Sequence, residues 1–188
     1  MTSSFPPVPP TNGRYVLRRL ETSPKAAKFI AATAANGGAT MDLKTGKLYG
    51  EKGPEEAESV GAEPSVHTGE PIATHIYAGK NNISATQFAH EHIRLGNLAD
   101  PDVAMGSWAN NGNVEIDASR VFTNPKAASE KVVERDQDAS FDFRNFENVP
   151  YEEHAKRIGS KKPQNKKAKN EMVITSDADL NTPKFRDE

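Results

Sequence analysis

Apolar positions recur at three- and four-residue spacing in three segments of the chain, which is the pattern of amphipathic helices. These segments begin at Ser23, Ser84 and Asn124, residue types that cap the first turn of a helix, and the first and third have Pro at the next position. The first segment ends at Asn36-Gly37-Gly38, where glycine can adopt the left-handed conformation that closes a helix. The sequence therefore predicts three helices.

Short apolar or alternating runs predict the strands of an antiparallel sheet. The clearest pair of runs lies on either side of Asn110-Asn111-Gly112, because Asn and Gly readily take the positive φ angles of a tight hairpin. Gly46 gives a second hairpin the same kind of turn. The expected strands are residues 15–20, 40–43, 47–49, 71–78, 103–108, 114–117 and 139–143.

The order strand, helix, hairpin occurs twice along the chain, at 15–49 and at 74–117. Because this order is common in small α+β domains, it indicates either two βαββ units in one continuous antiparallel sheet or a chance similarity. The expected fold class is α+β, with a small antiparallel sheet, about three helices packed on it and disordered N- and C-terminal tails.

Composition separates the folded part of the chain from its ends. The expected units are a Pro-rich disordered leader at 1–13, an α+β domain at 14–150 with a solvated acidic loop at about 51–70, and a charged, largely disordered tail at 151–188. Pro6 and Pro9 of the leader have the Pro-x-x-Pro spacing of some peptide ligands. From Gly159 onward the only apolar cluster is 172–174, which is too short to fold on its own.

The 188 residues are 35% hydrophobic and 27% charged, with a formal net charge of −2, which excludes a globally basic nucleic-acid-binding protein. The absence of Cys excludes disulfides, thiolate nucleophiles and zinc sites built on sulfur. The sequence begins without the basic and apolar regions of a secretory signal, and no run approaches the length of a membrane span. A cytoplasmic location without membrane contact is therefore expected.

The motif His90-Glu91-His92 resembles a metal-binding sequence, but residues i and i+2 of a helix point about 200° apart, so its two imidazoles cannot share an ion. The spacing His-Glu-x-x-His, the nucleophile elbow and the phosphate-binding glycine motifs do not occur in the sequence. We therefore assign no catalytic residue, no metal and no cofactor. A small toxin-like hydrolase using His75, His92 and Asp117 is retained as an alternative.

Trp108 stands close to the predicted hairpin turn and has two interpretations. A buried anchor is the more common role of Trp in a small domain. The alternative is a recognition tip formed by Trp108, Asn110 and Asn111, because Trp offers a large and rigid contact surface. These three residues are the candidate binding site for a protein partner.

A basic segment at 156–169 carries seven cationic residues and no acidic one, so it is suited to neutralise phosphates in a salt-sensitive way. It contains no aromatic residue that would stack on bases. The candidate nucleic-acid contacts are Lys161, Lys162, Lys166, Lys167 and Lys169.

Several short motifs occur together in the second half of the chain, between residues 74 and 143. They are Gly106-Ser107-Trp108, Gly112-x-Val114-x-Ile116-Asp117-x-Ser119, Ala127-Ala128 and Ala139-x-Phe141-Asp142. The set resembles a pattern in uncharacterised small proteins of actinobacterial phages and prophages. This resemblance implies a phage setting, in which the expected function is that of a non-catalytic accessory protein binding a host or virion protein. A nucleic-acid- or virion-associated protein acting through the basic segment is the other non-catalytic alternative.

Overall fold

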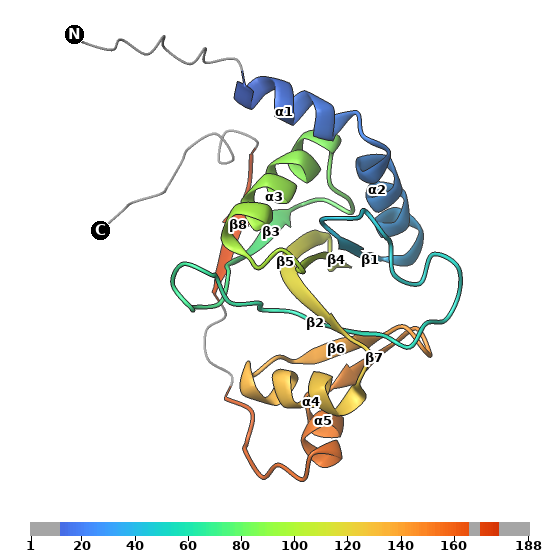
Figure 1. Ribbon diagram of the computed structural model, residues 1–188, viewed down its shortest axis with the longest axis vertical. Helices are drawn as coiled ribbons and strands as arrows, with labels where there is room; N and C mark the ends of the chain where they lie inside the picture. The colour runs from blue at the N-terminus through green and yellow to red at the C-terminus, as the bar shows by residue number, and fades with distance from the viewer. Residues whose placement is uncertain (1–11, 166–169, 177–188) are drawn as a thin grey trace, which may run out of the picture.

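The computed structural model describes residues 12–165 and 170–176 and shows a bent eight-stranded sheet with helices at both ends (Figure 1). The helices are α1 (Asn12–Glu21), α2 (Pro24–Asn36), α3 (Ala85–Leu98), α4 (Pro125–Glu134) and α5 (Tyr151–Arg157). The strands are β1 (Gly38–Asp42), β2 (Glu58–Val60), β3 (Thr74–Ala78), β4 (Ala104–Asn110), β5 (Asn113–Phe122), β6 (Ala139–Asp142), β7 (Glu147–Pro150) and β8 (Glu171–Ile174). The predicted α+β class is confirmed, but the sheet and the number of helices exceed the expected small domain.

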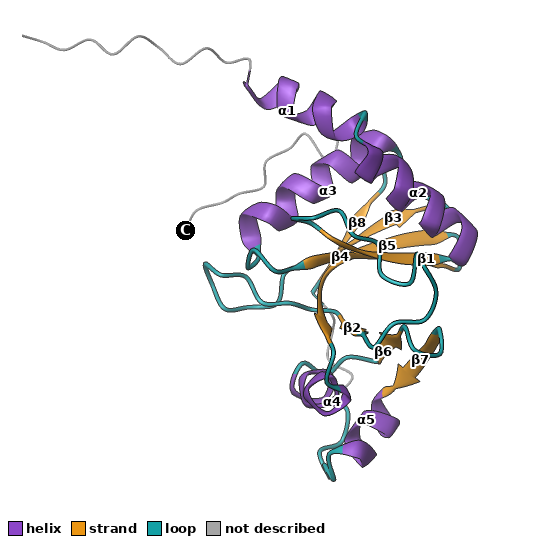
Figure 2. Cartoon of the chain, turned by 45° about the vertical axis from the view of Figure 1, so that its right-hand side comes forward, coloured by secondary structure: helices purple, strands orange, loops and turns teal. Residues whose placement is uncertain are grey.

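Strand β5 joins two halves of the sheet. In the upper half the strand order is β1-β4-β5-β3-β8, and α2 and α3 cover one face of these strands while α1 packs against α3 (Figure 2). In the lower half the C-terminal part of β5 pairs with β2, and the sheet continues through β6 and β7. Helix α4 packs on β2 and β5, and α5 packs on α4.

The three predicted helices are confirmed with the caps that the sequence indicates. The Ser23 side chain accepts a hydrogen bond from the Ala26 amide, and Gly37 ends α2 at a φ of +72°. Ser84 begins α3 with a complete capping box, and Asn124 caps α4. The β4–β5 hairpin turns at Asn111 and Gly112, which both have positive φ angles. Local signals therefore determine these elements.

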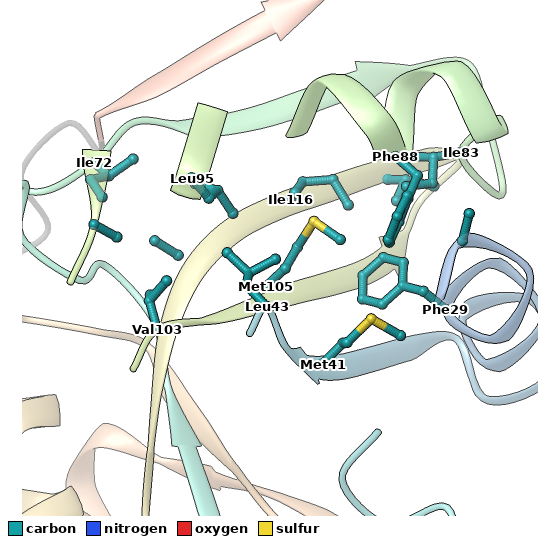
Figure 3. Packing of buried hydrophobic residues seen from close by; sticks show 14 of the residues in the cluster. Phe29, Met41, Leu43, Ile72, Ile83, Phe88, Leu95, Val103, Met105 and Ile116 are labelled. Atoms are coloured by element: carbon teal, nitrogen blue, oxygen red, sulfur yellow. The ribbon is translucent and has the colours of Figure 1, made fainter. Parts of the chain in front are cut away.

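Two hydrophobic clusters support the two halves. The larger lies between the upper sheet and α2 and α3, where Phe29 and Phe88 pack with their ring centroids 5.5 Å apart (Figure 3). Met105 of β4 and Ile116 of β5 belong to this cluster. Their side chains lie on the face of the sheet that α2 and α3 cover, and the neighbouring residues of each strand lie on the other face. The smaller cluster lies under α4 and α5 and includes Val60 of β2.

The strand expected at 15–20 is wrong, because these residues belong to α1. A short apolar run does not by itself distinguish a strand from a helix, and here the run lies in a helix that packs against α3. The first of the two supposed βαββ units therefore lacks its first strand. The expected antiparallel sheet is confirmed except at β8, which pairs parallel with β3. Helices α4 and α5 pack on the lower half and not beside α2 and α3.

The acidic segment at 51–70 is not merely a solvated loop, because it contains the buried strand β2. This strand is paired with β5 on one side and with β6 on the other. The expectation of disorder after Gly159 is likewise wrong for 171–174, which form β8. Both strands are stabilised by partners distant in sequence, so local composition could not reveal them. The Pro-rich segment 1–11 lies outside the described residues.

Candidate functional site

The upper half of the sheet has a face that is turned away from α2 and α3, which we call the distal face. Side chains of a strand alternate between its two faces. On β4, Ser107 lies on the helical side, where its hydroxyl is 2.7 Å from that of Thr33 in α2, so Gly106 and Trp108 lie on the distal face. On β5, Ile116 belongs to the core beneath the helices, which places Glu115 and Asp117 on the distal face.

One row of residues crosses the distal face from β4 to the sheet edge. Trp108 of β4 is opposite Glu115 of β5, Glu115 is opposite Ile76 of β3, and Ile76 is opposite Val173 of β8. Trp108 is 42% exposed and Val173 is 58% exposed. Large apolar side chains at this exposure on one face of a sheet are a feature of interaction surfaces. We call these four residues the distal row.

The structure resolves the two interpretations of Trp108 in favour of exposure, since the hydrophobic clusters do not include it. Asn110 and Asn111 are also exposed, and Asn110 lies two residues beyond Trp108 on the same face of β4. The turn is supported by Asn113, whose Oδ1 accepts a hydrogen bond from the Gly79 amide at 3.1 Å. Trp108, Asn110 and Asn111 are thus brought together at the end of the hairpin.

Asp117 lies next to the distal row and is enclosed by two glycines. Its carboxylate is so close to Gly61 and Gly106 that a methyl group on either glycine would overlap it. Ser119 donates a hydrogen bond to Asp117 Oδ1 at 2.8 Å. Burial raises the pKa of Asp117, and the Ser119 hydroxyl and the charge of Arg94 only partly oppose this effect. An acidic group with such a perturbed pKa is a candidate for a functional site.

The buried acidic side chains of the described chain all form ion pairs with arginine. The pairs are Glu58 with Arg144 and Arg157, Glu63 with Arg120 and Arg135, Glu91 with Arg94, and Asp142 with Arg144. Within the described ranges no ion pair involves Asp117. Asp117, which is half-buried, therefore differs from these carboxylates in having no ion-pair partner among the described residues.

Glu91 is the centre of a polar cluster on the helical side of the sheet. Its Oε1 is 2.6 Å from His75 Nδ1 and accepts a hydrogen bond from the Tyr77 hydroxyl, while Arg94 Nε donates to its Oε2 at 2.7 Å. Burial disfavours the charged form, but Arg94 and the two hydrogen-bond partners outweigh it and lower the pKa of Glu91. The sequence analysis named Glu91 only as the middle residue of the motif His90-Glu91-His92 and assigned it no role. Its position between Phe88 and Leu95 at helical spacing was the available signal.

The three residues of the hydrolase alternative do not form one site. His75 pairs with Glu91 beneath α3, and His92 Nε2 is 3.2 Å from the carbonyl oxygen of Leu43. Burial, with the nearby charge of Lys25, lowers the pKa of His92. Asp117 lies on the opposite face of the sheet from His75. The geometry therefore offers no shared reaction centre for these side chains.

The basic segment is partly committed to contacts within the chain. Arg157 pairs with the buried Glu58, and Lys162 Nζ donates to the carbonyl oxygen of Val133 at 2.9 Å. Lys161 is exposed. The candidate residues Lys166, Lys167 and Lys169 lie outside the described residues.

Within residues 12–165 and 170–176, no helix is long and apolar enough to cross a membrane. The same residues contain no group of three or more His, Asp or Glu side chains placed to hold a metal ion. No protein-family model matches the sequence, and neither characterised proteins nor solved structures show significant similarity to it. The inference of function therefore depends on the distal face and on the chemistry of its side chains.

Proposed function

We propose that this chain is a non-catalytic protein-binding module that recognises its partner through the distal face around Trp108. The observation that carries this proposal is the distal row, in which an exposed Trp and an exposed Val lie on one face of a paired sheet. The resemblance to phage proteins makes a host or virion protein the expected partner. The proposed contact residues are Trp108, Asn110 and Asn111.

Physical chemistry supports a binding role for this surface. Trp is enriched among the residues that contribute most to protein interfaces, because it buries a large area at little cost in side-chain entropy. Trp108 sits on a strand that is paired on both sides, by β1 and by β5, so its backbone is held in place before a partner arrives. A preformed surface loses less conformational entropy on binding than a flexible loop does.

The test is affinity capture from a bacterial lysate at low and moderate salt, with nuclease present, using the intact chain and its Trp108→Ala variant. We expect a stoichiometric protein that the intact chain captures and that Trp108→Ala loses. Phe146→Ala is the matched control, since Phe146 is an aromatic residue of similar exposure that lies outside the distal face. Capture that is the same with Trp108→Ala would contradict the proposal.

The same experiment distinguishes nucleic-acid binding through the basic segment from protein binding through the distal face. Nucleic acid recovered only without nuclease, and lost as the salt concentration rises, would assign the interaction to the basic segment at 156–169. The intramolecular contacts of Arg157 and Lys162 reduce the charge that this segment can offer to phosphates. We therefore place this alternative second.

A further inference from the structure

We infer that Trp108 and Asp117 together form a binding site for a guanidinium group, supplied by an arginine side chain of the partner. This inference rests on the proposed function, because it gives the chemistry of the group that the distal face recognises. It is carried by three observations: the place of Asp117 diagonally beside Trp108 on the distal face, the absence of an ion-pair partner of Asp117 among the described residues, and the exposed ring of Trp108.

Trp108 and Asp117 are neighbours on the distal face. Gly106 lies directly opposite Asp117 and two residues before Trp108 on the same face of β4. Asp117 is consequently a diagonal neighbour of Trp108, a separation that aromatic and long side chains can bridge. Gly106 has no side chain, and the Asp117 carboxylate and the Ser119 hydroxyl lie over its backbone, so no side chain of position 106 stands between Asp117 and Trp108.

Asp117 is half-buried and lacks the arginine partner that the buried carboxylates of the described chain have. Glu58, Glu63, Glu91 and Asp142 each form an ion pair with an arginine, whereas Asp117 has the Ser119 hydroxyl. A carboxylate withdrawn from water is costly unless a cation compensates it. The raised pKa of Asp117 is the expected consequence of this missing compensation. An arginine of the partner would provide the pairing that the chain itself provides elsewhere.

Trp108 makes a flat cation the best fit. A guanidinium group stacks on an indole face and at the same time donates hydrogen bonds to a carboxylate, which a compact ammonium group does less well. The described strand residues on the distal face of the upper half include the acidic residues Asp42, Asp117 and Glu171, and no Lys or Arg. The surface therefore favours a cationic group over a phosphate.

Trp108 is the only Trp of the chain, so fluorescence excited at wavelengths that the four Tyr residues do not absorb reports on this site alone. The probe is the peptide acetyl-Gly-Arg-Gly-amide, and the matched probe replaces Arg by citrulline, which has the same shape without the charge. We expect the Arg peptide to change the fluorescence of the intact protein with a Kd in about the millimolar range. The citrulline peptide should bind roughly tenfold more weakly.

Asp117→Asn should weaken binding of the Arg peptide roughly tenfold and leave binding of the citrulline peptide unchanged. Glu51→Gln is the matched control, because it removes one exposed carboxylate that pairs with Lys28. Equal binding of the two peptides to the intact protein would overturn the inference, and this comparison does not depend on how a variant folds. Unchanged affinity of a folded Asp117→Asn variant would also overturn it.

Failure of this inference can be distinguished from failure of the proposed function. If capture requires Trp108 but the two peptides bind equally, the distal face binds a partner without recognising a guanidinium group. If the Arg peptide binds as expected but capture does not require Trp108, the site exists and the proposed function is wrong.

Discussion

Glu91 and Asp117 lie on opposite faces of the upper sheet, and their pKa values are shifted in opposite directions. Glu91 accepts hydrogen bonds from Tyr77 and Arg94 and lies beside His75, and its pKa is lowered. Asp117 has a single hydroxyl partner, and its pKa is raised by burial. The two acids differ mainly in the donors around them, since burial acts against the charged form of both.

This difference separates a residue that stabilises the fold from one that is available for recognition. The charge of Glu91 is fully engaged by three side chains of the same chain, and removing it would leave those side chains without their acceptor. The charge of Asp117 is poorly compensated in the free protein, so a ligand that compensates it gains binding energy. The acid on the helix-covered face therefore stabilises the fold, and the acid on the distal face belongs to the candidate site.

The comparison predicts its largest effect at Glu91. Glu91→Ala should lower the free energy of unfolding by about 3–5 kcal/mol, because it leaves the buried Arg94 charge without its partner. Urea denaturation followed by circular dichroism measures this loss. His90→Ala, at the neighbouring and less buried position of α3, is the control and should change stability by about 0.5 kcal/mol or less. If both variants were equally stable, the Glu91 cluster would contribute no more to the free energy of unfolding than a less buried residue of α3 does.

At Asp117 we expect the opposite effect, a substitution that raises the free energy of unfolding. Its folded pKa is raised above the ordinary value of 3.8, so the folded state holds the proton more tightly than the unfolded state. The resulting penalty is absent below that ordinary value and grows as the pH rises toward the folded pKa. Asp117→Asn should therefore stabilise the protein at pH 7 by on the order of 1 kcal/mol.

This gain should disappear when denaturation is repeated at a pH below the ordinary pKa of aspartate. Glu91 provides the opposite reference, since its lowered pKa adds stability above the ordinary value for glutamate that is lost as the pH falls. An Asp117→Asn variant that is destabilised at pH 7 would show that the carboxylate is compensated within the chain, and the two acids would no longer differ.

Sequence reasoning recovered the elements whose causes are local. Ser23, Ser84 and Asn124 cap helices through contacts within the first turn, and the Asn111-Gly112 turn is fixed by its own φ angles. Strand β2 depends on contacts that are distant in sequence. Its residue Glu58 is buried in an ion pair with Arg144 and Arg157, which lie far along the chain. No local sequence pattern indicates an ion pair between residues so far apart in the chain.

The candidate site was predictable only in part. The hairpin and its Trp could be read from the sequence, but exposure of Trp108 depends on which face of β4 the helices cover. The distal row requires the registers of four strands, including β8, whose pairing with β3 spans about 100 residues of the chain. The burial of Asp117 depends on Gly61, which follows β2 and lies against the Asp117 carboxylate. The spacing of these two residues in the sequence does not predict that contact.

The smallest effect on stability is expected at Trp108, where the effect on binding should be largest. Trp108→Ala should change the free energy of unfolding by only about 0.5 kcal/mol, because the ring is exposed and lies outside both hydrophobic clusters. Phe29→Ala is the contrasting variant, with an expected loss of about 3–5 kcal/mol, since Phe29 is fully buried under α2. Denaturation followed by circular dichroism compares the two variants. A loss at Trp108 as large as that at Phe29 would make this Trp a structural anchor, and the distal face would then have no exposed aromatic group that is free of a role in folding.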